Sequence, residues 1–470
     1  MTIDSLFQQH TARLQQELAT GLSRHCPQAG AVLLHSGSHT PYYQDDQYPP
    51  FRAWGHFLRW LPVERPGQFL LLEPGARPVF YAIVPPDFWH DQSLDLPAWW
   101  ADGFEIIILP DEASFIEQFR QRPVSAARCV FLGENSGSSG GTLADALGIA
   151  ASNVNPPALL AWLDYQRAFK TDYEAQRIGD ANARAIDGHQ AAHDAFLADG
   201  DEYDIHLAYL RACRALDEEL PYPSIVALDQ HAAILHYQHK QRRPASIGGA
   251  AQRSQVLLID AGFRLHGYCA DITRTWARPG VHPVFQALLD GVRQLQQRSL
   301  DDIVSGLPYP TLHERAHQQL AELLLTTGVA HGTADELLEL GVAQCFMPHG
   351  LGHLLGLQVH DVGGHQIDAD GTILPPPERF PALRTTRTIA PGMVFTIEPG
   401  LYFIPMLLEK LRSELRQVQR TALLDWQLIE QLAPLGGIRI EDNVLVTDDG
   451  IHNLTRQPLL SERRGASTAR

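Results

Sequence analysis

The stretch LLIDAGFRLHGYCADITRTW, residues 257–276, decides the fold of this chain. Within it Asp260 and Asp271 lie 271 − 260 = 11 positions apart, with Gly262 and Gly267 between them. A glycine-bearing turn between two apolar runs predicts a β-hairpin. Such a hairpin would aim both carboxylates into one cavity of a sheet.

Three further stretches carry acidic or imidazole side chains. They are MPHGLGHLLGLQVHDVGG at 347–364, VFTIEPGLYF at 394–403 and GGIRIEDNVLV at 436–446, and they supply His353, Glu398 and Glu441. Four carboxylates that converge without cations would repel one another and take up protons. Their convergence therefore predicts a metal centre, whose oxygen-rich donors favour manganese or magnesium. A single such residue would cap a turn or face solvent instead.

Composition narrows the class of protein. The chain has 37 Lys and Arg against 54 Asp and Glu, a formal charge of −17. This charge disfavours nucleic acids and anionic membranes as partners, because attraction to phosphate needs clustered basic residues. No apolar run reaches membrane-spanning length, and the N-terminus is amphipathic without a signal core. The five scattered cysteines indicate buried free thiols in a reducing compartment, so we expect a cytoplasmic protein.

The length of 470 residues and the 44% apolar content predict two or more domains. Strand candidates alternate with helical patterns over residues 1–160, which predicts an α/β domain without its own catalytic residues. An Asn-Pro-Pro break at 155–157 precedes the second domain, residues 161–470. A long helix is expected over 171–197 and another near 310–328, and the insertion 405–432 also reads as helical. The polar tail 461–470 is expected to fray.

The ordered residues Asp260, Asp271, His353, Glu398 and Glu441 resemble the metal ligands of the pita-bread metallopeptidases. Nearly the whole chain is similar to the bacterial Xaa-Pro dipeptidases (prolidases), including those also described as organophosphorus acid anhydrolases. The stretches DDQYPPFRAWGHFLRWLPV at 45–63 and PPDFWH at 85–90 share this similarity. The resemblance implies an α/β (α+β) chain with a creatinase-like N-terminal domain and a pita-bread catalytic domain.

The resemblance also implies two divalent metal ions per subunit, with manganese as the expected ion. Asp260 would bind one ion, His353 and Glu398 the other, and Asp271 and Glu441 would bridge them. The ions, roughly 3.5–4 Å apart, would share a hydroxide as the nucleophile. Glu398 would also act as base and proton shuttle. His360 would contact the tetrahedral intermediate, unless it is a structural histidine paired with Asp361.

Further residues match positions around the substrate pocket of the family. They are Tyr222, His236, His349, Arg384, Arg439, Asp45 and Trp89. Arg384 would hold the terminal carboxylate of a dipeptide, with Arg387 as its competitor. Tyr222, which stands between two prolines, could instead be a turn residue. His349 would support the metal ligands without binding the ions itself.

Asp45 and Trp89 match residues that the similar proteins donate to the pocket of a partner subunit, which implies a homodimer. Asp46 fits this position as well as Asp45 does. His189 and His193 have the i,i+4 spacing of a zinc pair but lack the glutamate of the HExxH pattern. We therefore expect them on a solvated helix face.

The expected activity is hydrolysis of Xaa-Pro dipeptides with release of proline. Aminopeptidase P, which acts on longer peptides that begin Xaa-Pro, is the alternative within the same chemistry. Hydrolysis of organophosphate esters and fluorides is a possible side activity. A pseudoenzyme that retains the domain as a protein- or RNA-binding module is a rival from another class, and the complete ligand set and the negative charge oppose it.

Overall fold

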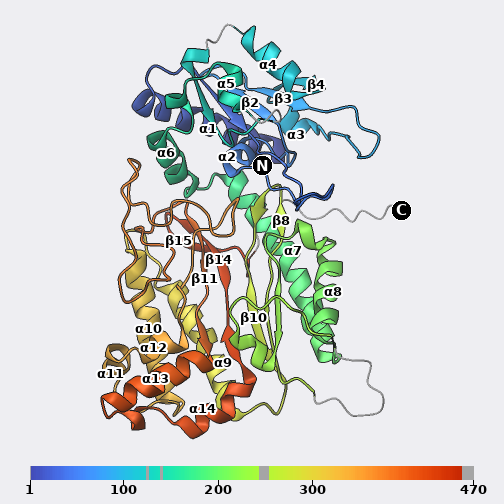
Figure 1. Cartoon of the computed structure of the whole chain (residues 1–470). Helices are drawn as coiled ribbons and strands as arrows, with labels where there is room; N and C mark the ends of the chain where they lie inside the picture. Colours follow the sequence, from blue (N-terminus) through green and yellow to red (C-terminus); the bar gives the residue numbers. More distant parts are fainter. Residues whose placement is uncertain (1, 123–125, 138–140, 243–252, 458–470) are drawn as a thin grey trace.

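The computed structural model describes residues 2–122, 126–137, 141–242 and 253–457, so the predicted fraying of the tail lies outside it. Two α/β units stack on one another, with the N-terminal unit uppermost in Figure 1. This confirms the predicted α/β class. None of the described helices is both long and apolar enough to cross a bilayer.

The N-terminal unit is built on a mixed five-stranded sheet with the order β4-β3-β2-β1-β5. Its strands are β1 (Ala31–His35), β2 (Phe69–Leu72), β3 (Val79–Ile83), β4 (Glu105–Leu109) and β5 (Cys129–Leu132). All of them lie within residues 1–160, where strand candidates alternating with helical patterns were predicted. Its helices are α1 (Ile3–His25), α2 (Gly55–Trp60), α3 (Ala98–Ala101), α4 (Glu112–Arg120), α5 (Leu143–Leu147) and α6 (Pro157–Arg167).

Strands β1, β2 and β5 are buried on both faces, and their successive side chains point to opposite sides of the sheet. On β1, Val32 and Leu34 pack in one apolar cluster with helix α1, whereas Ala31 and Leu33 pack in another with helices α4 and α5. The continuous apolar run of β1 follows from this two-sided burial. The first cluster also contains Leu159 of α6, so α6 packs on the N-terminal unit.

The second unit begins with α7 (Asp172–Leu197), whose Thr171 and Glu174 form a capping box. Ile178, Ala185, Ala192 and Phe196 are buried along one face of it, and the helix predicted over 171–197 is confirmed. The other helices are α8 (Glu202–Cys213), α9 (Pro283–Asp301), α10 (Tyr309–Thr326), α11 (Ala334–Glu339), α12 (Val342–Phe346), α13 (Pro405–Gln417) and α14 (Trp426–Leu432). The helical predictions near 310–328 and over 405–432 are confirmed, the latter as α13 and α14.

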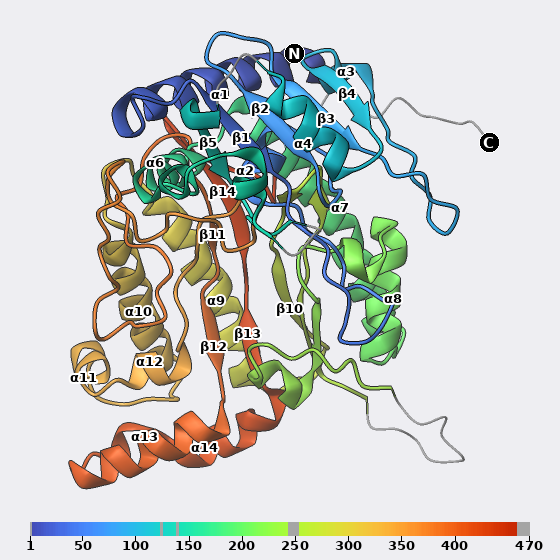
Figure 2. The ribbon, with the colours of Figure 1, turned by 45° about the horizontal axis from the view of Figure 1, so that its top comes forward.

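The strands of this unit form a set of small sheets between two groups of helices. They are β6 (Ile225–Leu228), β7 (Val256–Asp260), β8 (Arg264–Leu265), β9 (Tyr268–Cys269), β10 (Thr273–Ala277), β11 (Val394–Ile397), β12 (Gly400–Tyr402), β13 (Gly437–Arg439), β14 (Asp442–Thr447) and β15 (Gly450–Asn453). The sheet orders are β10-β7-β6 and β11-β14-β15, with pairs β12-β13 and β8-β9. Helices α7 and α8 lie on one side of these strands, and α9, α10 and α12 on the other (Figures 1 and 2).

A buried ion network joins the two units. Arg59 of α2 donates to Glu174 of α7 at 3.2 Å and to Glu17 of α1 at 2.9 Å. The hydroxyl of Tyr268 on β9 also donates to Glu174. Burial alone would raise the pKa of Glu174, but the Arg59 charge holds it below its usual value. The carboxylate of Glu174 is therefore the anion that compensates a buried guanidinium.

We expect Glu174→Gln to destabilise the chain by about 3–5 kcal/mol, because the buried Arg59 would lose one of its two carboxylate partners and keep only Glu17. Since the folded-state pKa of Glu174 is depressed, its stabilisation is present above the unfolded pKa and is lost as the pH falls below about 4. Urea unfolding at pH 7 and pH 3 measures both effects. Glu414→Gln is the control, because Glu414 pairs with Lys410 at 3.8 Å on the surface and should cost less than about 1 kcal/mol. Equal losses for the two variants would contradict the buried-pair account.

Candidate metal centre

The predicted hairpin forms and places the two aspartates side by side. Strands β7 and β10 pair antiparallel, with Asp260 opposite Thr273. The connection between them contains the two-residue strands β8 and β9, which turn at His266 and Gly267 with φ of 50° and 87°. Positive φ at both positions is the geometry of a tight hairpin turn, which explains the glycine. Asp260 ends β7 and Asp271 lies two positions before β10.

Backbone hydrogen bonds bring the other three candidate ligands to the same place. The Glu441 N–H donates to the Thr273 carbonyl at 3.0 Å, which joins the 436–446 stretch to β10. The Thr396 N–H donates to the His353 carbonyl at 3.0 Å, so the 347–364 stretch lies against β11. Strand β11 pairs with β14, with Ile397 opposite Asp442. Five residues from four separate stretches therefore converge.

Gly352 makes the approach of the histidine stretch to β11 possible. A Cβ atom at this position would lie 2.0 Å from the Thr396 carbonyl oxygen and 2.5 Å from the Tyr309 hydroxyl. Only glycine allows this close backbone approach. Gly352 thus lets the backbone next to His353 lie directly against strand β11.

The ligand atoms are close enough to share cations. One atom each of Asp271, His353 and Glu441 lie within 4.8 Å of one another. The His353 Nε2 lies 3.3 Å from an Asp271 oxygen and 3.5 Å from a Glu398 oxygen. Its Nδ1 donates to the Leu354 carbonyl at 3.0 Å, so Nε2 faces the carboxylates, as a donor when the ring is protonated and as a lone pair when the ring is neutral. A lone pair that faces two carboxylates is stable only with a cation or a proton between them.

The electrostatics of the carboxylates also require a cation. Burial raises the pKa of Asp260 to about 6 and that of Glu398 to about 7. Burial, reinforced by the charge of Asp271, raises the pKa of Glu441 well above its usual value. Burial alone would raise the pKa of Asp271 as well, but its hydrogen bond with His353 holds it below the usual value. The four carboxylates are therefore buried beside too few positively charged side chains to compensate their negative charge.

Glu441 provides the clearest sign of a missing partner. One of its oxygens accepts from the Thr273 hydroxyl at 2.6 Å, whereas the other, Oε1, is buried and has no hydrogen-bond partner among the residues that the structure describes. A buried carboxylate oxygen without a partner is costly. The residues present thus fit divalent metal ions, and oxygen-rich donors with one imidazole suit hard cations.

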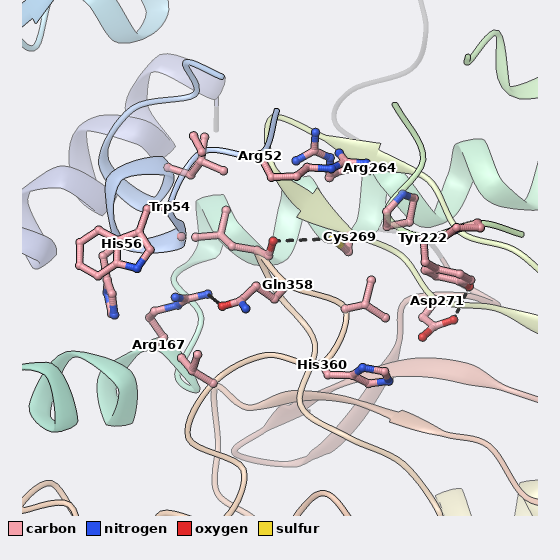
Figure 3. Close-up of a pocket in the computed structure, with 18 of the residues that line it drawn as sticks. Arg52, Trp54, His56, Arg167, Tyr222, Arg264, Cys269, Asp271, Gln358 and His360 are labelled. Atoms are coloured by element: carbon pink, nitrogen blue, oxygen red, sulfur yellow. Dashed lines mark hydrogen bonds between the residues drawn. The ribbon is translucent and has the colours of Figure 1, made fainter. Parts of the chain in front are cut away.

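Arg439 and Tyr222 hold the Asp260 carboxylate from its two sides. Arg439 donates to Asp260 at 2.5 Å and to the Tyr402 hydroxyl at 2.8 Å. The Tyr222 hydroxyl lies 2.7 Å from Asp260 and also contacts Asp271 (Figure 3). Tyr222 is thus a member of the centre and more than a turn residue between two prolines. His349 lies behind Glu398, 3.9 Å away, and bonds to the Tyr402 hydroxyl at 2.9 Å.

His360 and His236 both line a cavity of about 860 Å³ that opens onto Asp260 and Asp271 (Figure 3). The His360 ring lies 4.4 Å from the His353 ring, centroid to centroid. Burial, together with the charges of His353 and Arg384, lowers the pKa of His360 to about 4. A neutral imidazole therefore faces the centre near pH 7.

Asp361 does not pair with His360, so that structural alternative for His360 was wrong. Its carboxylate accepts from Arg167 at 2.5 Å and from Lys170 at 3.0 Å, and all three side chains are buried. Arg167 and Lys170 belong to the connection between α6 and α7, which joins the two units. The loop that carries His360 is thus anchored to this connection by a buried ion triad.

The structure separates the two competing arginines of the 383–387 segment. Arg387 is buried, with its guanidinium 4.1 Å from the Tyr165 ring and 5.2 Å from the Phe169 ring. Arg384 is exposed beside His360 and makes no ion pair within the described part of the chain. Of the two, Arg384 is free to bind a ligand.

Asp45 and Trp89 do not reach the cavity of their own chain. Asp45 accepts from the backbone N–H groups of Asp46 and Gln47, and Trp89 is 78% exposed. Both lie on loops that project from the N-terminal unit (Figure 2). Asp46 is exposed on the same loop. Neither the Asp45 nor the Trp89 side chain lines the cavity beside the candidate ligands of its own chain.

The expectation of a solvated face for both His189 and His193 was wrong for His189. His189 is 4% exposed and bonds to the Ala261 carbonyl at 2.9 Å, whereas His193 stacks on Trp276. His189 thus supports the backbone directly after Asp260 from helix α7. The expectation of buried free thiols holds for Cys129, Cys213 and Cys269, while the thiols of Cys26 and Cys345 are half-buried.

Sequence reasoning missed two threonines that orient the carboxylates. Thr273 donates to Glu441, and Thr396 lies 3.3 Å from a Glu398 oxygen and accepts from the His353 N–H at 3.1 Å. Each stands two positions from a ligand candidate, Thr273 after Asp271 and Thr396 before Glu398. Residues two apart share one face of a strand, so this spacing was the available signal.

Known proteins match the chain along nearly its whole length. Residues 176–448 match the model of metallopeptidase family M24, and residues 5–165 match that of the Xaa-Pro dipeptidase N-terminal domain. An Xaa-Pro dipeptidase of Aeromonas hydrophila is 42% identical over 96% of this chain and 98% of its own, and that of Pseudoalteromonas atlantica is 39% identical over the same shares. The solved structure of aminopeptidase P from E. coli is 22% identical, with a TM-score of 0.71 over 98% of this chain and 96% of its own. These matches confirm the creatinase-like and pita-bread architecture.

Proposed function

This chain belongs to metallopeptidase family M24 and is a bacterial Xaa-Pro dipeptidase (prolidase), and we propose that its centre hydrolyses Xaa-Pro dipeptides with two divalent ions. The observation that carries this proposal is the convergence of Asp260, Asp271, His353, Glu398 and Glu441, with the partnerless Glu441 oxygen among them. Asp271 and Glu441 are the proposed bridging ligands. Manganese is the proposed ion, because the donors are mostly carboxylate oxygens.

When bound, the two ions would supply Lewis acidity and lower the pKa of the water that serves as nucleophile. The side chains of the chain supply the remaining functions. Arg384 would hold the terminal carboxylate of the dipeptide, and neutral His360 would donate to the oxygen of the scissile carbonyl as negative charge develops. Glu398 would take a proton from the attacking water and pass it to the proline nitrogen. His236, His349 and Arg439 would line the pocket and hold these groups in place.

The experiment that tests this function compares two peptides after metal removal. Metal-stripped enzyme should be inactive, and added manganese should restore cleavage of Ala-Pro but give little cleavage of Ala-Pro-Ala. A dipeptide places its carboxylate within reach of Arg384, whereas the tripeptide places it one residue further on. Manganese-dependent preference for the tripeptide would instead assign the chain to aminopeptidase P chemistry.

Asp361→Asn should lower kcat for Ala-Pro about 10- to 100-fold, because the loop of His360 would lose its anchor to Arg167 and Lys170. The manganese affinity should change little, since Asp361 touches none of the proposed ligands. The substitution also leaves two buried cations under-compensated, so kcat must be referred to the folded fraction. Isothermal titration with manganese and steady-state kinetics at 15 °C separate these effects. A weaker manganese affinity with unchanged kcat would contradict the positioning role.

We also propose that the enzyme is a cytoplasmic homodimer in which Asp45 and Trp89 contact the pocket of the partner subunit. The exposed loops that carry them and the five free cysteines support this. Mixing Asp45→Asn subunits with Asp271→Asn subunits tests it. If Asp45 acts across the interface, the mixed dimer contains one pocket with neither substitution and regains activity. No regain of activity would contradict this role.

A side activity on organophosphate esters and fluorides is a further proposal, because the same nucleophile can attack a phosphorus centre. Fluoride release from a fluorophosphate by the manganese-loaded enzyme tests it. The absence of metal-dependent release would exclude it.

A further inference from the structure

The 860 Å³ cavity extends from the metal centre to the N-terminal unit. Asp271 and His360 lie at one end, Trp54 and His56 lie at the other, and Arg52 lies between the two ends beside Arg264 (Figure 3). Neither Arg384 nor any other residue of the 365–387 loop lines it. If Arg384 holds the proline carboxylate, as the proposed function requires, the Xaa residue of the substrate faces this cavity.

Most charged groups around the far end are already paired. Arg264 binds Glu64 at 2.7 Å, Arg167 binds Asp361, and His56 bonds to Asp164 at 2.8 Å. Arg264 thus has a carboxylate partner of its own, whereas Arg167 shares that of Asp361 with Lys170. The carboxylates of Asp260 and Asp271 at the near end belong to the metal centre.

Arg52 is the exception among these groups. Its Nη2 donates to the carbonyls of Glu218 and Leu220 at 2.9 and 2.5 Å, and it makes no ion pair within the described part of the chain. Burial and the nearby charge of Arg264 lower the pKa of Arg52. An anion between the two guanidinium groups would relieve their repulsion. A substrate ammonium group would be repelled from the same place.

We propose that this cavity is the subsite for the Xaa side chain and that Arg52 selects acidic side chains, those of Asp-Pro and Glu-Pro. Arg52 comes from the N-terminal unit, so that unit sets the preference for Xaa while the catalytic unit supplies the chemistry. Nη2 uses its two N–H groups on the two carbonyls, so the other three N–H donors of the guanidinium, on Nε and Nη1, remain for a carboxylate. Glutamine in place of glutamate has the same shape without the charge, so it measures the contribution of Arg52 directly.

The test is kcat/KM of the manganese-loaded enzyme on Glu-Pro, Gln-Pro and Ala-Pro. The wild type should cleave Glu-Pro about tenfold more efficiently than Gln-Pro, since a hydrogen bond between charged groups contributes about 1.5–3 kcal/mol in general. Arg52→Gln should bring the ratio of kcat/KM on Glu-Pro to kcat/KM on Gln-Pro near one. Arg52→Glu should instead cleave Lys-Pro more efficiently than Glu-Pro. Arg52 also holds the turn before Tyr222, so its substitution can lower the activity on every substrate. The readout is therefore the ratio of kcat/KM between Glu-Pro and Gln-Pro, and not the activity on either dipeptide alone.

Arg77→Gln is the matched control. Arg77 lies in the same unit, is exposed, and donates through Nη2 to two carbonyls, those of Asp102 and Phe104, but it does not line the cavity. This variant should keep the wild-type ratio. Equal efficiency on Glu-Pro and Gln-Pro in the wild type, or an unchanged ratio in Arg52→Gln, would overturn the subsite while leaving the dipeptidase function intact. Failure to cleave Ala-Pro as well would overturn the proposed function and this inference with it.

Discussion

Replacement of Asp271 by asparagine should lower kcat for Ala-Pro by about a thousandfold or more, because loss of a bridging carboxylate removes several kcal/mol of stabilisation of the transition state. Asp271 lies between His353 at 3.3 Å and the Tyr222 hydroxyl, so it is central among the candidate ligands. An amide keeps the shape of the side chain but loses its charge and one acceptor oxygen.

Manganese should no longer stabilise the Asp271→Asn variant against thermal unfolding. A ligand at a hundred times its Kd stabilises the folded state by about 2.7 kcal/mol, which thermal unfolding resolves. Asp301→Asn is the matched control, because Asp301 lies on the exposed end of helix α9 and should keep both activity and response. Full manganese stabilisation of Asp271→Asn would contradict its assignment as a ligand.

Arg384→Met should lower kcat/KM for Ala-Pro about a hundredfold, because a bidentate contact with the substrate carboxylate would be lost. The amide Ala-Pro-NH₂ lacks that carboxylate, so wild type and variant should cleave it with equal efficiency. This pair of substrates distinguishes loss of the carboxylate contact from general damage to the loop.

Arg379→Met is the control within the same loop. Arg379 lies over the Phe380 ring at 4.6 Å, away from His360. It should retain wild-type efficiency on both substrates. A loss in Arg384→Met that is equal for the acid and the amide would contradict the carboxylate contact.

The elements of the catalytic unit could be predicted because their signals are local. The hairpin at Asp260 and Asp271 follows from two glycines between apolar runs, and helix α7 follows from its periodic apolar face and its capping box. The five candidate ligands were found because each lies in a short unusual stretch. Their convergence in space depends on backbone bonds between stretches far apart in the sequence.

Other features depend on contacts that no local pattern encodes. His189 was placed on a solvated face because the pair with His193 lacks the glutamate of the HExxH pattern, but the backbone directly after Asp260 covers it. Asp361 follows His360 directly, yet it pairs with Arg167 and Lys170, more than 190 positions earlier. Arg384 and Arg387 look equivalent in sequence, and only the packing of Tyr165 against Arg387 separates them.

The central claim is that Asp260, Asp271, His353, Glu398 and Glu441 together hold two divalent ions. Anomalous diffraction from crystals grown with manganese tests it most directly, because each ion gives its own peak. The account predicts two peaks per chain, roughly 3.5–4 Å apart, with Asp271 and Glu441 contacting both. A single peak, or peaks away from these five side chains, would contradict it.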